Sequence, residues 1–149
     1  VKGALLHRFI AYVEWPESAF AGPDSPLVIG ILGNDTLAAE LQAFEAGRRA
    51  DKRPITVRRV RAPDNLKDVH LLFIDGAERQ QLERAARAAP FALIVTEWPN
   101  ALKQGSVINF TLVNDQLRFE ISLESARQRN LRLSSRLLSV AHDVRAATP

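Results

Sequence analysis

Residues 107–121 hold the pattern that most restricts the fold: two runs of alternating apolar and polar residues, separated by Asn114-Asp115. Asn and Asp both tolerate the left-handed backbone that a two-residue hairpin turn needs. With these two residues as the turn, three apolar pairs oppose one another on one face: Ile108 with Ile121, Phe110 with Phe119, and Leu112 with Leu117. A slip of one residue would break these pairs, so the sequence predicts a β-hairpin with this register.

The other face of the predicted hairpin is polar. In the same register, Thr111 opposes Arg118 and Asn109 opposes Glu120. Successive side chains of a strand point to opposite faces, so one face is expected to join the core. The polar row is expected either to contact a partner protein or to bond to the helices that follow it.

Composition limits the class of protein. With 149 residues, 46% hydrophobic and 25% charged, the chain is expected to form one globular domain, 1–149. No apolar run approaches the roughly 20 residues that span a bilayer. There is no cysteine, which excludes disulfides and thiol chemistry. There is no methionine either, so we expect a processed or trimmed chain from which any signal peptide has been removed.

Strand and helix patterns alternate along the chain. Three short apolar runs predict strands buried on both faces: Leu27 to Leu32, His70 to Ile74 and Phe91 to Thr96. Between and after them, helical spacing predicts helices, one capped by Asp35 or Thr36 with Leu37, Leu41 and Phe44 inward, and a last one continuing to Val144. We therefore predict an α/β fold: a three-layer α/β/α sandwich with a mixed, mostly parallel sheet and a C-terminal antiparallel hairpin.

No motif for catalysis, metal binding or a cofactor stands out. Gly30 and Gly33 form G-x-x-G, which matches neither the dinucleotide fingerprint nor the phosphate loop. The three histidines lie far apart, and His70 begins an apolar strand, which favours a structural role. We expect no catalytic residue, no metal and no cofactor. We therefore expect that the protein is not an enzyme.

Two alternatives place a site at the carboxyl edge of the sheet, where Asp35, Asp75 and Thr96 follow buried strands. Ligands of open α/β sheets collect at this edge. One alternative is a small-molecule pocket near Asp75 and Thr96. The other is a phospho-acceptor receiver domain with Asp75 as acceptor, although Asn34-Asp35 is a weak acidic pair and no lysine follows on a next parallel strand.

A basic segment spans residues 48–61 and contains Arg48, Arg49, Lys52, Arg53, Arg58, Arg59 and Arg61. It has two interpretations: a surface for an acidic partner or lipid headgroups, or a solvated loop followed by a charged edge strand that discourages aggregation. We favour the second. No aromatic residue alternates with the arginines, so no nucleic-acid partner is expected. Trp15 and Trp98 are expected to lie in or near the core.

Several stretches, in order along nearly the whole chain, resemble the YfiR-type periplasmic regulators. They are Ala4-Leu5-Leu6 to Phe9, Tyr12-Val13-Glu14-Trp15-Pro16, residues 26–33, 54–59 and 70–74, Ile108-Asn109-Phe110, Leu117 to Ile121, and Leu133 to Leu138. The best-known type of that family carries disulfides that affect its stability and redox response, and a cysteine is often found at the position of Val69. Because this chain has none, disulfide-based redox switching is not expected.

The resemblance implies a function. It suggests an exported, non-enzymatic repressor that binds the periplasmic domain of a membrane-bound diguanylate cyclase, and so regulates cyclic di-GMP and biofilm formation. The alternative is that this chain is a small-molecule-sensing extracytoplasmic domain that acts on a sensor histidine kinase or another membrane partner. A homodimer is a further expectation. The family's Phe-Glu motif corresponds to Phe119 and Glu120. Together with the polar row, this gives five expected partner-binding residues: Glu120, Phe119, Asn109, Arg118 and Thr111.

Overall fold

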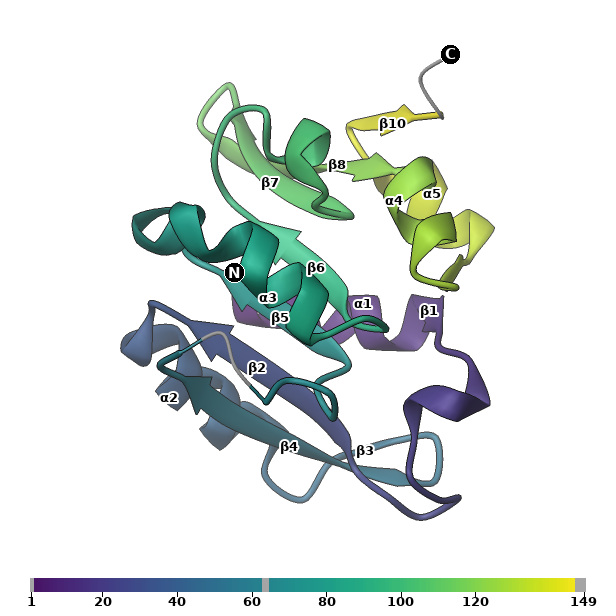
Figure 1. Cartoon of the computed structure of the whole chain (residues 1–149). Coiled ribbons are helices and arrows are strands. Elements are labelled where there is room, and N and C mark those ends of the chain that lie inside the picture. The colour runs from purple at the N-terminus through teal and green to yellow at the C-terminus, as the bar shows by residue number, and fades with distance from the viewer. Residues whose placement is uncertain (1, 63–64, 147–149) are drawn as a thin grey trace.

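The computed structural model describes residues 2–62 and 65–146. At its centre lies a sheet of eight strands in the order β10-β8-β7-β6-β5-β2-β4-β3 (Figure 1). The strands are β2 Leu27–Leu32, β3 Arg49–Ala50, β4 Arg53–Val60, β5 Leu71–Ile74, β6 Leu93–Thr96, β7 Ile108–Val113, β8 Gln116–Ser122 and β10 Asp143–Arg145. Only the β7–β8 and β3–β4 pairs of this sheet are antiparallel, so the predicted mixed, mostly parallel sheet is confirmed.

The five central strands β4-β2-β5-β6-β7 are parallel. Numbered along the chain, their spatial order is 2-1-3-4-5, one of the common doubly wound arrangements. In such sheets the strand order reverses between the first and third strands, and ligands favour the carboxyl end of that gap. Here that gap lies between β2 and β5.

Helices cover both faces of the sheet, which confirms the three predicted layers. The helices are α1 Lys2–Tyr12, α2 Asp35–Glu45, α3 Leu82–Ala88, α4 Leu123–Gln128 and α5 Ser135–Val140, with 3₁₀ helices at Glu17–Ala19, Gly76–Gln81 and Ala101–Gln104. Alternate residues of β2, β5 and β6 divide between two cores, so Phe73 belongs to the core with α1, α2 and α5 while Leu72 belongs to the core with α3. In Figure 1, α3 lies in front of the sheet and α1 and α2 lie behind it.

The hairpin has the predicted register, with Ile108 opposite Ile121, Phe110 opposite Phe119 and Leu112 opposite Leu117. Asn114 and Asp115 form the turn with φ of 52° and 62°, the left-handed backbone expected of them. Phe110 and Phe119 are 2% and 5% exposed and pack on Phe9 of α1, at ring-centroid distances of 5.9 and 5.1 Å. The apolar row is therefore core at the base of the hairpin.

Three details differ from the prediction. Asn34 caps α2, because its side chain accepts the Leu37 N–H at 2.9 Å, so the cap is neither Asp35 nor Thr36. Phe44 was expected inward but is 40% exposed, because its ring packs edge-on against His7 of α1, at 5.1 Å between ring centroids, and not in the core. The last helix ends at Val140, and residues 143–145 instead form β10, which pairs parallel with β8.

The segment after α1 is held at the amino-terminal edge of the sheet. β1 (Val13–Glu14) pairs with β9 (Arg132–Leu133), and Trp15 Nε1 donates to the His70 carbonyl at 2.7 Å. The His70 ring is buried. Its Nδ1 accepts the Val28 N–H at 3.0 Å. Its Nε2 lies 2.8 Å from the Ala19 carbonyl oxygen and donates to it, because a carbonyl can only accept. These contacts confirm the structural role predicted for His70.

The apolar row predicts a sharp contrast between two positions of one strand. Phe110→Ala is expected to lower the free energy of unfolding by about 4 kcal/mol, because it opens a cavity beneath α1. Leu112→Ala, at a side chain that is 68% exposed, should change it by less than about 0.5 kcal/mol. Urea unfolding of both variants checks this, and equal losses would contradict the observed burial.

His70 should make stability depend on pH. Burial lowers the pKa of His70 below its ordinary value of 6.5, so the folded state takes up this proton less readily than the unfolded chain does. The contribution of the neutral His70 ring to the free energy of unfolding is fully present above about pH 6.5. It decreases as the pH falls below that value, by up to about 1.4 kcal/mol per pH unit. Unfolding between pH 7.5 and pH 5 should show a shallower slope in His70→Gln. The exposed His142 supplies His142→Gln as the control for replacing a histidine by glutamine. An unchanged slope in His70→Gln would contradict the assignment.

Candidate partner-binding site

Asn109, expected on the open polar face, is buried. Its side chain is bonded on both sides: Oδ1 accepts the Thr96 hydroxyl at 2.7 Å and the Trp98 N–H at 3.2 Å, while Nδ2 donates to the Trp98 carbonyl at 2.9 Å. The residue is 3% exposed. Hydrogen bonds of Asn109 therefore connect the hairpin to the loop after β6. Its side chain is not accessible to a partner in this conformation.

Phe119 is also enclosed, because it belongs to the aromatic packing around Phe9. The remaining three of the five expected residues are more accessible. Arg118 is exposed, and its guanidinium donates to the Gln116 side chain at 2.8 Å. Glu120 pairs with Arg145 of β10 at 3.3 Å, and 19% of its side chain is exposed. Thr111 is half-buried. Partner binding by these residues remains a prediction.

A small groove opens on the other face of the hairpin, where the apolar row runs past the helices that cover it. Its volume is about 150 Å³, and it is lined by Leu5, Arg8, Phe9, Leu117, Arg118, Phe119, Leu137 and Val140. Val140 is 56% exposed. Leu112, the cross-strand neighbour of Leu117, is 68% exposed. The signal in the sequence was the third apolar pair, Leu112 with Leu117, which lies nearest the turn and furthest from the sheet.

The carboxyl edge is occupied by structural contacts. At the gap between β2 and β5, Asp75 accepts the Ala77 N–H at 3.1 Å and the Asn34 amide at 3.2 Å, so both its oxygens have partners. The Thr96 hydroxyl is buried against Asn109. Lys2 pairs with Glu97, which follows β6, at 2.6 Å. These contacts favour neither the pocket expected here nor the receiver interpretation.

Two cavities lie instead at the amino-terminal edge, around Trp15. Their volumes are about 960 and 470 Å³. Among residues 2–62 and 65–146, no group of three or more His, Asp or Glu side chains is placed to hold a metal ion. None of the helices formed by those residues has the length and apolar character of a membrane span.

Comparison with known proteins gives one family and one fold. The family model described as YfiR/HmsC-like matches residues 1–142. A similar solved structure, a conserved domain protein of Vibrio cholerae O1 biovar El Tor, superposes with a TM-score of 0.55 at 9% identity, covering 79% of this chain and 54% of that one. This chain thus spans about half the length of that protein, and the likeness supports the fold alone. No functionally curated protein matches the chain.

Burial of Asn109 predicts that its mutation acts on stability. Asn109→Ala should lower the free energy of unfolding by about 3 kcal/mol, because it leaves the Trp98 N–H and carbonyl without their partner. Thr111→Ala, one alternation further along the same row, should change it by less than about 0.5 kcal/mol. Thermal and urea unfolding measure both. A fully stable Asn109→Ala protein would show that these hydrogen bonds contribute little.

Proposed function

The chain belongs to the YfiR/HmsC-like family, and on that premise we propose that it is a periplasmic repressor that binds the periplasmic domain of an inner-membrane diguanylate cyclase. The family itself points to a non-enzymatic regulator of cyclic di-GMP signalling. In the proposed mechanism the bound repressor holds the cyclase inactive, and its release raises cyclic di-GMP and promotes biofilm formation.

The exposed end of the hairpin is the observation that supports this proposal best. Folded proteins bury most large apolar side chains, yet Leu112 is 68% exposed and Val140 is 56% exposed beside an apolar groove. Leu117 extends this surface toward the core. An apolar surface of this kind, bounded by charged residues, is typical of protein–protein contacts.

Charge suggests what the partner segment contains. The groove is lined by two arginines, Arg8 from α1 and Arg118 from β8. No carboxylate among the described residues pairs with either one. A partner segment with an apolar side chain for the groove and a neighbouring carboxylate for the arginines would satisfy both features. Glu120 does not line the groove; it lies two residues from Arg118 along β8, and we include it in the proposed contact as part of the polar row.

The test is binding to the purified periplasmic domain of a membrane diguanylate cyclase from the same organism. Leu112→Asp/Arg118→Glu should raise the Kd at least tenfold, about 1.4 kcal/mol, while the fold stays intact. Glu120→Ala should also weaken binding, and in cells both variants should raise cyclic di-GMP. Isothermal calorimetry and a cyclic di-GMP reporter provide the measurements.

Arg79→Glu/Lys103→Glu changes two exposed cations outside the groove and is the control for altered charge. It should bind like the wild type. A folded Leu112→Asp/Arg118→Glu protein with wild-type affinity would place the contact elsewhere on the molecule. Absence of any binding by the wild type would remove the cyclase as partner.

A second candidate function, small-molecule sensing on behalf of a histidine kinase or other membrane partner, is supported by the cavity of about 470 Å³. Its size suits a metabolite, and its walls include Ile10, Leu27 and Ile55, with Arg49 and Arg53 among its charged residues. A thermal-shift screen separates the two functions, because a true ligand stabilises the folded protein by mass action.

A further inference from the structure

Positive charge is concentrated in one part of the chain. Residues 47–68 contain eight Lys or Arg and three Asp, a net charge of +5, whereas the whole chain carries +3. The remaining residues therefore sum to −2. Such separation of charge creates a directed electrostatic potential that a uniform distribution would not.

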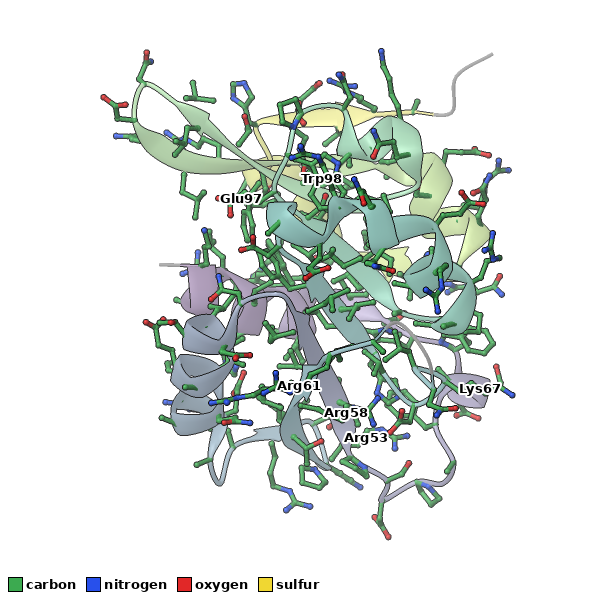
Figure 2. The ribbon with its side chains drawn as sticks, turned by 60° about the vertical axis from the view of Figure 1, so that its left-hand side comes forward. Arg53, Arg58, Arg61, Lys67, Glu97 and Trp98 are labelled. Atoms are coloured by element: carbon green, nitrogen blue, oxygen red, sulfur yellow. The ribbon has the colours of Figure 1, made fainter. Side chains whose placement is uncertain are left out.

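The fold places this charge along one margin of the sheet. β4 is the last long strand on that side, and β3 covers only its beginning, pairing Arg49 with Pro54 and Ala50 with Arg53. Figure 2 shows Arg53, Arg58 and Arg61 following β4 in order. Eight residues of strand extend about 26 Å, and their side chains alternate between the two faces, so the cations are distributed along this margin on both faces of the sheet.

Much of this charge is not neutralised. Arg48 donates to the Phe44 carbonyl at 2.7 Å and Arg49 donates to the Lys52 carbonyl at 2.8 Å. Carbonyl oxygens orient these guanidinium groups without cancelling their charge. Lys52 beside them has no carboxylate partner among the described residues. Of the segment's other cations, Arg58 pairs with Asp68 at 3.0 Å and Arg61 lies 3.9 Å from Asp35.

An exposed aromatic ring stands next to these cations. Phe44 is 40% exposed at the end of α2, and the Arg48 guanidinium carbon lies 4.4 Å from the centre of its ring. Arginine and lysine beside an exposed aromatic side chain is the combination found in surfaces that bind membranes peripherally, where cations meet anionic headgroups and the ring enters the interface. His7 of α1 packs edge-on against the same ring, at 5.1 Å between centroids, so only the exposed part of Phe44 is available to a membrane. An acidic protein would use the cations alone.

We infer that the surface formed by Phe44, Arg48, Arg49 and Lys52 docks on a membrane that carries anionic phospholipid headgroups. The neighbouring cations of residues 53–67 add long-range attraction toward the same surface. This inference goes beyond the proposed function, because it concerns lipid and needs no protein partner. Attraction of about 1 kcal/mol per cation near the headgroups makes three cations worth about 100-fold in partitioning.

The experiment is co-sedimentation of the whole chain with vesicles of equal parts phosphatidylglycerol and phosphatidylcholine, compared with phosphatidylcholine alone. Binding is expected only to the anionic vesicles and should weaken as salt rises to about 0.5 M. Arg48→Glu/Arg49→Glu/Lys52→Glu should lower partitioning about 100-fold or more. The milder Arg48→Gln/Arg49→Gln/Lys52→Gln variant keeps the test valid if the reversed charges impair folding.

A matched control is Arg79→Glu/Lys103→Glu/Arg132→Glu, which changes net charge equally at exposed cations elsewhere. It should retain binding within about threefold, and an equal loss would show that net charge alone matters, which overturns the inference. Phe44→Ser should remove the binding that persists at high salt, with circular dichroism as the check on folding. Failure of the wild type to bind anionic vesicles would also overturn the inference. Binding to polyglutamate without binding to lipid would point to an acidic protein as the partner and would overturn it as well.

Discussion

The packing of Phe9 against Phe110 and Phe119 is the contact on which the rest of the structure depends. It joins the first helix to the hairpin, with ring-centroid distances of 5.9 and 5.1 Å. Phe73 from the middle of the sheet reaches the same cluster, 6.3 Å from Phe110. Because the rings fill the space between α1 and the sheet, they fix where the hairpin begins to project and hence which of its residues reach solvent.

How much the sequence could predict is clearest in the hairpin. Alternation fixed the register, because any slip would have exchanged the two faces, and the observed pairs agree with it throughout. Alternation does not say what covers each face. The polar residue Asn109 is buried because the loop at Trp98 folds over it, and the apolar residue Leu112, in the pair nearest the turn, is exposed. The accessible apolar side chains therefore lie beside the groove, on the face opposite the polar row.

Other features had no readable signal in the sequence. The spacing of Val144 is compatible with a continuation of the last helix and also with a strand. Only its pairing with Ile121 of β8 decides for the strand. Arg129 resembles a surface residue. It is buried, donates to the carbonyls of Ala89 at 2.6 Å and Ala86 at 2.8 Å, and burial lowers its pKa to about 10. Such long-range contacts depend on the fold as a whole, whereas local patterns predict only elements.

The position of α1 has a consequence for biogenesis. Phe9 lies near the beginning of the chain, but both rings that enclose it come from the last third, and β1 likewise pairs with β9, more than a hundred residues later. Contacts this distant in sequence form slowly, because a long loop must close before they contribute. The amino-terminal part cannot acquire its native packing until the hairpin has been synthesised. Delayed folding of this kind keeps the amino-terminal part of the polypeptide unfolded for longer during synthesis.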